Sequence, residues 1–351
     1  MNYEEINVQP RDLTSQWRSF GQFWTEYAAT IAPLEPQQWW EQPTVVSPDL
    51  EALLLSARAT AELPSNETLT QALEAELLQL LSRVVHPRDL EVLRQYFDWG
   101  DFVDLALWLY GWRGSDPRAE LYPTVPQPCY GSPLNAKVFT IFNNPGADPR
   151  IEARDDSLAW KEFVDDQKAH LTRHQDLERA GVEEHLLPWA TEKRVVTKEG
   201  KPERRYERSL YFGNGTKDTF MGRIYEINAI FHLDFLAYQS KDRKAKFVNK
   251  ISKMNEKGVW LPSQEHSLLL AAAWANQASQ SGGLDGAKPA RLIVRKGKFL
   301  AEAICARLTN EQARSVQGLL WKLQRAGSKY LTENTLVRMF GENDENTVPP
   351  Q

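Results

Sequence analysis

Two asparagines, a proline and a glycine form the first group of residues whose types and order could support chemistry. Asn143, Asn144, Pro145 and Gly146 come directly after Lys137–Phe142, a short apolar and aromatic run that predicts a buried strand. At the carboxyl edge of a parallel sheet, where ligands bind, an asparagine amide can orient a water molecule or hold the edge of a base. The same residues also suit a plain turn, because proline fixes φ and glycine allows positive φ. The sequence leaves both interpretations open.

A second group of polar and aromatic residues leaves the run Ile224–Leu233, a less regular strand candidate. Asp234 can accept hydrogen bonds from an amino group, and Phe235 and Tyr238 can stack on a ligand or line its pocket. His232 suits either a place in this site or a hydrogen-bonded position in the core. We therefore treat the end of this run as a candidate binding site.

The run Ala290–Arg295 is a third strand candidate, and it ends in a compact cationic turn. Arg295, Lys296 and Lys298 surround a single glycine there. This turn is not a phosphate-binding P-loop, because the glycine spacing and the trailing serine or threonine of that motif are absent. We expect its three cations to contact nucleic-acid phosphates.

A weaker strand candidate, Lys329–Thr332, precedes Asn334. Helical segments separate the strand candidates: Ser263–Ser279 is rich in leucine and alanine, and Thr309–Gly327 begins with a capping box. Strands that alternate with helices predict an α/β fold with a four-stranded parallel sheet between helices. We therefore expect four residues to lie near one edge of this sheet: Asn144, Asp234, Lys296 and Asn334.

The first part of the chain differs from the rest in pattern and in charge. Apolar residues at helical spacing predict an all-α domain over residues 1–115, a Pro-rich linker over 116–136 and the α/β domain over 137–345. Residues 1–125 contain 8 arginines, no lysine and 19 acidic residues, whereas residues 126–351 contain 34 basic and 28 acidic residues. The split suggests an acidic domain that binds a protein partner and a basic domain that meets a polyanion. Solvated helix faces explain the acidic half equally well.

Two insertions carry much of the basic charge of the α/β domain. Residues 192–208 contain 7 basic and 4 acidic residues around a Gly-Lys-Pro turn signal, which predicts an exposed hairpin. Residues 241–258 contain 7 basic and 2 acidic residues and an apolar seam at helical spacing. This second insertion is either a solvated surface helix or an arm that contacts phosphates. The lysines that would make those contacts are Lys244, Lys246 and Lys250.

Composition excludes several classes of protein. A mean hydropathy of −0.53 and 25% charged residues argue against an integral membrane protein, and no run approaches the roughly 20 apolar residues that span a bilayer. The only two cysteines, Cys129 and Cys305, are too few for a disulfide framework or a four-thiolate cluster. His170 and His174 lack the glutamate of a zinc protease motif. We expect a cytoplasmic protein with no metal and no cofactor.

The order of the strand ends resembles the uracil-DNA glycosylase superfamily, whose fold is a four-stranded parallel sheet between helices. Members carry an N-P-G or related motif after the first strand, and the run from Phe142 to Gly146 is similar to it, with phenylalanine where the family usually has glycine. Asp234 takes the position of the family's base-reading asparagine. Asn334 is the nearest match to the family's last motif, although no proline follows it. The resemblance covers about residues 128–340, apart from the insertions.

This resemblance implies a DNA glycosylase that acts on single- or double-stranded DNA, flips a nucleotide out of the stack and hydrolyses its N-glycosidic bond. It implies that Asn144 handles the attacking water, with Asn143 and Asn334 as further catalytic residues. Trp160 is an aromatic that would stack on the flipped base, and it suits a core position as well. The residues implied to surround the base are Asp234, Phe235, Tyr238, Trp160, Pro145 and Gly146.

The carboxylate at position 234 is the departure from the family pattern with the greatest consequence. An asparagine can pair with both O4 and N3–H of uracil, whereas a carboxylate accepts hydrogen bonds from the exocyclic amine of cytosine or adenine. Asp234 therefore predicts a substrate with an amino group, a modified cytosine, as in members of the superfamily that act on modified viral DNA in bacterial defence. The alternative is a non-enzymatic nucleic-acid-binding adaptor that keeps the sheet without catalysis.

Overall fold

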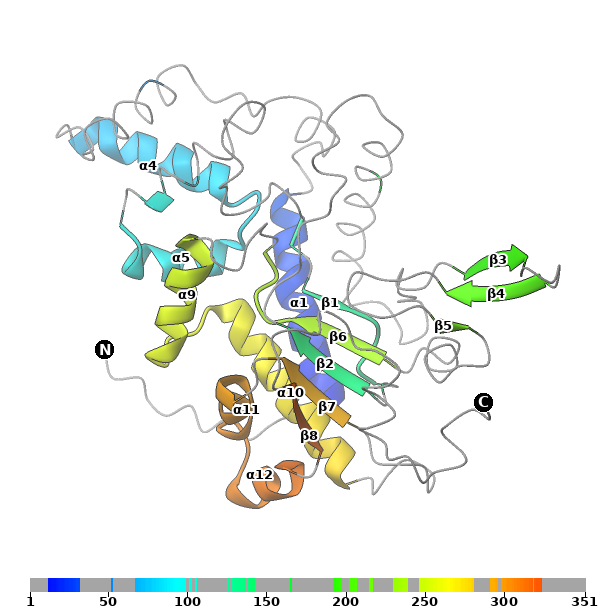
Figure 1. The fold of residues 1–351 in the computed structure, drawn as a ribbon. Helices are drawn as coiled ribbons and strands as arrows, with labels where there is room; N and C mark the ends of the chain where they lie inside the picture. The colour runs from blue at the N-terminus through cyan, green and yellow to red at the C-terminus, as the bar shows by residue number, and fades with distance from the viewer. Residues whose placement is uncertain are drawn as a thin grey trace.

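The computed structural model describes a set of helices and strands that share one core (Figure 1). Statements about structure below concern these residues only. The described ranges are 12–31, 67–98, 125–142 without 127, 135 and 137, 230–238, 246–280, 291–295, 298–317 and 319–323, with shorter pieces at 52, 101–102, 105, 165, 192–196, 202–206 and 215–216.

A five-stranded sheet forms the centre of the fold. Four of its strands run parallel, and β1 pairs with β6 in the antiparallel direction. In spatial order the strands are β1 (Cys129–Tyr130), β6 (Ile230–Asp234), β2 (Val138–Phe142), β7 (Arg291–Arg295) and β8 (Leu320–Leu323). The prediction of a parallel sheet packed among helices is therefore confirmed, whereas the fourth parallel strand differs from the predicted one.

The order of the parallel strands creates a topological switch point. The chain passes from β2 to β6 on one side, and then crosses to β7 and β8 on the other side of β2. Ligands of open α/β sheets bind outside the carboxyl ends of the strands at such a point. Here the switch point lies between the ends of β2 and β7, with β6 as the next strand.

The fourth parallel strand is not where the sequence predicted it. The expected helix 309–327 is the shorter α12 (Asn310–Gln317), and residues 320–323 pair with β7 as β8. The capping box is confirmed, because the Thr309 N–H donates to Gln312 Oε1 (3.0 Å) and the Gln312 N–H donates to Thr309 Oγ1 (3.3 Å). A short apolar run does not distinguish helix from buried strand by periodicity, and pairing with β7 decides between them. The strand expected at 329–332 lies outside the described residues.

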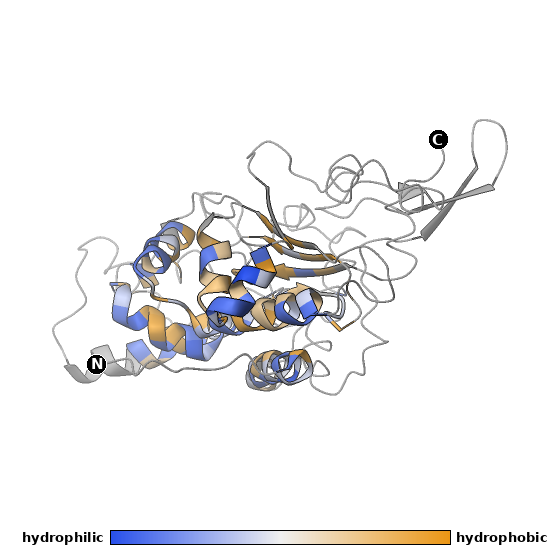
Figure 2. Ribbon diagram, turned by 90° about the horizontal axis from the view of Figure 1, so that it is seen from below, coloured by the Kyte–Doolittle hydropathy of each residue, from blue (hydrophilic) through white to orange (hydrophobic). Residues whose placement is uncertain are grey.

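Helices α1 (Leu13–Ile31) and α10 (Pro262–Gln280) pack against each other and against one face of the sheet. Trp17 of α1 meets Phe231 edge-on at 5.7 Å, and Trp274 of α10 lies 5.2 Å from Phe139. Figure 2 shows that these strands are largely apolar, whereas the helices have one hydrophilic and one hydrophobic side. The remaining described helices are α4 (Glu67–Leu81), α5 (Pro87–Tyr96), α9 (Lys246–Glu256) and α11 (Lys298–Cys305).

The N-terminal helices and the sheet share a single hydrophobic core. Five aromatic side chains of α1 are buried in the same cluster as the sheet residues: Trp17, Phe20, Phe23, Trp24 and Tyr27. Full burial of each such side chain stabilises the fold by roughly 1.5–3 kcal/mol. The domain boundary at residue 115 and the linker 116–136, of which only part is described, stay predictions.

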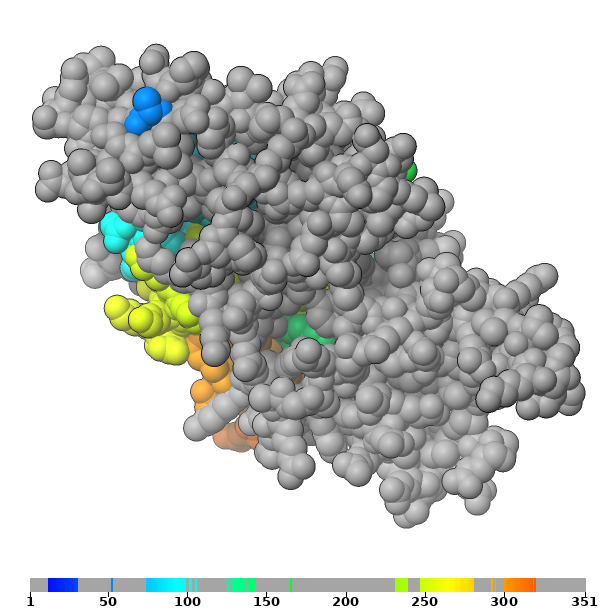
Figure 3. Space-filling model, turned by 45° about the horizontal axis from the view of Figure 1, so that its top comes forward, coloured from blue at the N-terminus to red at the C-terminus, as the bar shows by residue number. Residues whose placement is uncertain are grey.

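The first basic insertion has the hairpin that the sequence predicted, and the second contains a helix. Strands β3 (Glu192–Val196) and β4 (Pro202–Tyr206) form an antiparallel hairpin, which β5 (Gly215–Thr216) extends to a separate sheet. In the second insertion, α9 buries its apolar seam of Phe247, Ile251 and Met254. Part of α9 is visible on the molecular surface, near residues of α5 and α11 (Figure 3).

Candidate functional site

The two faces of the central sheet differ in chemistry. Successive side chains of a strand point to opposite faces, so the Phe-His-Leu-Asp order of β6 separates apolar from polar residues. Phe231 and Leu233 join the hydrophobic core beneath α1 and α10. His232 and Asp234 lie on the opposite face, beside Thr140 of β2. Three polar side chains are therefore buried side by side, at 0–1% exposure, on one face of the sheet.

These three side chains form a short polar chain. Thr140 Oγ1 lies 2.7 Å from His232 Nδ1, and it also donates to the Phe231 carbonyl at 3.3 Å. On the other side of the ring, His232 Nε2 lies 3.3 Å from Asp234 Oδ1. Phe142 packs edge-on against the imidazole, with ring centroids 4.8 Å apart. The threonine and the phenylalanine thereby fix the orientation of the histidine ring.

The possible hydrogen bonds limit where the protons of Thr140 and His232 lie. If the Thr140 hydroxyl donates to the Phe231 carbonyl, then Nδ1–H donates to Thr140; if the hydroxyl donates to Nδ1, the ring carries its proton on Nε2. The Nε2 atom on the other side of the ring has only the 3.3 Å ion-pair contact with Asp234 Oδ1, in a site without exposure to solvent.

Asp234 is a buried carboxyl group with few partners of its own. Its backbone N–H donates to the Pro128 carbonyl (2.9 Å), and the next N–H, of Phe235, donates to the Phe142 carbonyl (2.7 Å), so the strand end is fixed. Neither carboxyl oxygen accepts a hydrogen bond from a residue that the structure describes, and the His232 contact is an ion-pair distance without hydrogen-bond geometry. Burial raises the pKa of Asp234, and His232 partly offsets that rise.

An unsatisfied buried carboxyl group costs stability, so its presence calls for an explanation. Asp234 ends β6 directly opposite Phe142, which ends β2, and Arg295 ends β7 two strands away. This places Asp234 at the carboxyl edge of the sheet, one strand from the switch point. Perturbed, buried titratable groups at such edges are candidates for binding and catalysis.

Several predicted site residues cannot be placed relative to Asp234. Asn143 follows the last residue of β2 in the chain, and Lys296 follows the last residue of β7. Arg295, Lys246 and Lys298 are the end of β7 and the starts of α9 and α11. The predicted site residues that lie outside the described part of the chain are Asn143, Asn144, Pro145, Gly146, Trp160, Lys244, Lys296 and Asn334.

Phe235 and Tyr238, which we expected to surround a ligand, have core positions. Phe235 is 5% exposed and packs edge-on against Trp260, with centroids 5.7 Å apart. Tyr238 donates its hydroxyl hydrogen to Asp89 Oδ2 (2.5 Å) and accepts from the His86 N–H (3.1 Å). The tyrosine therefore joins the segment after β6 to α5, and stacking on a base would require it to leave these partners.

Asp89 is a polar core residue that the sequence did not reveal. It accepts hydrogen bonds from the Ser263 N–H (2.9 Å) and the Ser263 hydroxyl (2.5 Å) as well as from Tyr238. Since Leu261, before α10, has no side-chain acceptor, Asp89 satisfies an N-terminal N–H of α10 from another helix. Burial raises the pKa of Asp89 to about 6, against the lowering effect of these hydrogen bonds.

Lys250, one of the predicted phosphate ligands, has an intramolecular partner. Its ammonium forms an ion pair with Asp101, lies 3.5 Å from Asp98 and lies 5.4 Å from the centroid of the Phe97 ring. Asp101 is buried, so this contact holds α9 against the segment that follows α5. A DNA phosphate would have to compete with Asp101 for this lysine.

Comparisons with models of protein families, with curated proteins and with solved structures each found no match. The resemblance to glycosylases therefore rests on the motifs alone. Within the described part of the chain, no group of three or more histidine, cysteine, aspartate or glutamate side chains could hold a metal ion. Among the helices described, none is long and apolar enough to cross a membrane.

Proposed function

We propose that the chain is a DNA glycosylase that excises a modified cytosine and leaves an abasic site. The observation that carries this proposal is Asp234: a buried carboxyl group at the carboxyl edge of a parallel sheet, whose oxygens accept no hydrogen bond from the described residues. Two further features support it. The N-P-G motif begins at Asn144, two residues after the end of β2, and β2 borders the switch point.

The amine edge of cytosine complements such a carboxyl group. Cytosine presents an amino donor at C4 next to the acceptor N3. A neutral carboxyl group offers the matching pair, because one oxygen accepts from the amine while the protonated oxygen donates to N3. In this pairing Oδ1 accepts from the amine, and Oδ2–H donates to N3. The raised pKa of Asp234 favours the neutral form that this pairing needs.

The same pairing supplies the proton that base departure requires. When the C1′–N1 bond breaks, its electron pair stays with the base, and N3 takes the carboxyl proton of Asp234. A water molecule, oriented by Asn144, forms the new C1′–O bond and releases one proton, which replaces the one lost by Asp234. The products are a neutral base and an abasic site. General acid catalysis of this kind contributes typically about 10²–10⁴-fold to a rate.

A second filter must protect ordinary cytosine, because excision of that base would damage the genome of the host. We propose that a substituent at C5 of cytosine provides the filter and that the insertions at 192–208 and 241–258 enlarge the site for it. Such a preference suits defence against viruses with modified DNA. The cytoplasm is the compartment in which that DNA would be met.

The function is tested by incubating the protein with duplexes that contain uracil, cytosine or 5-modified cytosine and by scoring alkali-labile abasic sites. We expect abasic sites only at the modified cytosine. Asn144→Ala should abolish base release and leave DNA affinity nearly unchanged, because water is positioned for the transition state rather than for binding. Binding of DNA without any abasic product would instead support the non-enzymatic adaptor.

A further inference from the structure

The connection between α9 and α10 holds a tryptophan in a rigid position. Gly258, two residues after the end of α9, has a φ of 78°, and the Val259 N–H donates to the Met254 carbonyl at 3.0 Å, which is the Schellman motif that commonly ends helices. With the Asn255 amide oriented so that its nitrogen faces carbonyl groups, that nitrogen donates to the Val259 carbonyl at 2.9 Å. Both the N–H and the carbonyl of Val259 are therefore bonded to α9, and these bonds fix the backbone that leads into Trp260.

Trp260 links the candidate site to an exposed aromatic side chain. Its ring meets Phe235, the residue after Asp234, edge-on, and it stacks on Phe299 of α11 with centroids 5.1 Å apart and planes 28° apart. Phe299 is 36% exposed and is one of two exposed large hydrophobic side chains in the described part of the chain; the other is Tyr96 of α5. The row Phe235–Trp260–Phe299 therefore runs from the carboxyl edge of the sheet to the surface.

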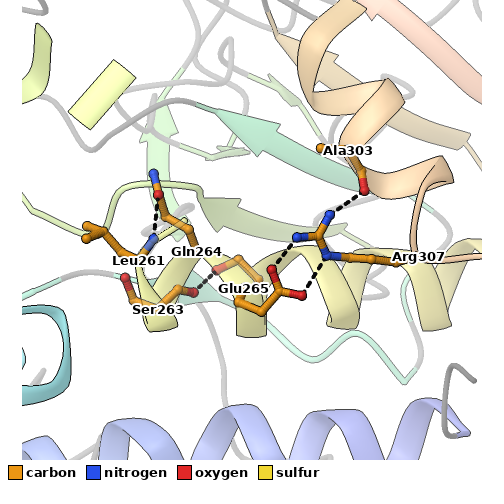
Figure 4. A network of polar contacts seen from close by, with 7 residues as sticks. Leu261, Ser263, Gln264, Glu265, Ala303 and Arg307 are labelled. Atoms are coloured by element: carbon orange, nitrogen blue, oxygen red, sulfur yellow. Dashed lines mark hydrogen bonds and ion pairs between the residues drawn. The ribbon is translucent and has the colours of Figure 1, made fainter. Parts of the chain in front are cut away.

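The tryptophan is also flanked by a fixed cation. The Arg307 guanidinium lies 5.6 Å from the centroid of the Trp260 ring, within cation–π distance. Figure 4 shows how it is held: Nε donates to Glu265 Oε1 (2.8 Å), Nη2 pairs with Glu265 Oε2, and Nη1 donates to the Ala303 carbonyl (2.6 Å). Arg307 is therefore held by three contacts. Its guanidinium in turn restricts the Trp260 ring, on which Phe299 stacks.

Phe299 follows a basic stretch of the sequence. Arg295, Lys296 and Lys298 precede it within four residues, and Glu302, one turn further along α11, is the one acidic residue of that helix. A single exposed apolar residue is ordinary on a protein surface. An exposed aromatic that is stacked on a fixed indole and preceded by three cations is the combination that single-stranded nucleic acids bind, through base stacking and phosphate contacts.

We propose that Phe299, backed by Trp260, is a stacking platform for an unpaired base of single-stranded DNA beside the site at Asp234. The inference rests on the proposed function only in taking DNA as the ligand. The cations that would meet the phosphates of the strand are those that precede Phe299 in the sequence: Arg295, Lys296 and Lys298. Stacking on a π-face tolerates any base, so the platform binds without sequence preference.

The test measures binding of the full chain to single-stranded oligothymidine by fluorescence anisotropy. Phe299→Ala should weaken binding by about 5- to 150-fold, the range that follows from one lost base–aromatic stack. Phe299→Trp should restore the affinity. The salt dependence should keep its slope, because stacking releases no counterions. Tyr96→Ala, the other exposed aromatic, is the matched control and should bind like the wild type.

A direct stacking signal completes the experiment. 2-Aminopurine within the oligonucleotide should lose fluorescence on binding to the wild type and keep it with Phe299→Ala. Equal affinity of Phe299→Ala and the wild type, tighter binding of oligouridine RNA than of DNA, or no DNA binding at all would each overturn the platform. These readouts need no base release. If the abasic-site assay fails while the affinity change is found, the platform stands without the glycosylase.

Discussion

Asp89 and Asp234, the two most deeply buried aspartates among the described residues, differ in the hydrogen bonds that they accept. Burial raises the pKa of both. Asp89 accepts three hydrogen bonds, from the N–H and hydroxyl of Ser263 and from the hydroxyl of Tyr238. Asp234 has only the His232 contact at 3.3 Å, and its oxygens accept no hydrogen bond from the described residues. The comparison separates a carboxylate that holds helices together from one whose oxygens have no hydrogen-bond donor among the described residues.

The largest expected effect is the loss of stability when Asp89 is removed. Asp89→Ala leaves the Ser263 and Tyr238 donors unpaired inside the core, and we expect a loss of about 3–4 kcal/mol in the free energy of unfolding. Asp234→Ala is the matched control, with an expected loss below about 1 kcal/mol, because no described hydrogen bond disappears. Denaturant unfolding at neutral pH measures both. An equally large loss of unfolding free energy for Asp234→Ala would contradict the difference that we infer between the two aspartates.

The pH dependence of the free energy of unfolding should also show the titration of Asp89. Its folded-state pKa of about 6 exceeds the ordinary value of 3.8, so the folded state binds this proton more tightly than the unfolded chain does. This contribution to stability is fully present below pH 3.8 and is lost as the pH rises through 6. At about 1.4 kcal/mol per pKa unit, the loss is about 3 kcal/mol.

Asp89→Asn, which cannot titrate, isolates this contribution. The difference in unfolding free energy between wild type and variant should change by most of that amount, about 2.4 kcal/mol, between pH 4 and pH 7, in the direction of a relatively more stable variant at pH 7. A pH-independent difference would show that Asp89 does not titrate in this range.

A smaller effect concerns Lys250, which the structure pairs with Asp101. Lys250→Met leaves that buried carboxylate without its cation, so we expect a loss of about 1–3 kcal/mol in unfolding free energy. DNA affinity should change little, because the ammonium is already engaged. Lys253→Met, at an exposed position of the same helix, should stay within about 0.5 kcal/mol of the wild type. If Lys250→Met were as stable as the wild type and its DNA binding depended less on salt, Lys250 would be a phosphate contact after all.

The elements that the sequence predicted best are those with local signals. β2 and β7 lie within the apolar, β-branched runs that predicted them, and α12 begins at its capping box. β8 was not predicted because a strand of four residues is too short to show a periodicity. Its pairing with β7 depends on tertiary contacts that the local sequence does not reveal.

The candidate site was predictable only in part. Asp234 stood out because it ends a strand, and His232 because it shares that strand. The Asp89 cluster had no such signal, since its partners lie 149 and 174 residues away in the chain. Nothing local to Asp89 distinguishes it from a solvated acid of an amphipathic helix. Partnerships of this range follow from packing rather than from a motif.

The most direct test of Asp234 as the reader of an amine is a specificity measurement on one substitution. Base release by the wild type and by Asp234→Asn should be compared on 5-modified cytosine and on uracil duplexes. We predict that the wild type prefers modified cytosine and that the variant shifts toward uracil by about 1–3 kcal/mol, roughly 5- to 150-fold, because an amide can donate to O4. An unchanged ratio, or a wild type that excises uracil and leaves modified cytosine intact, would contradict the account.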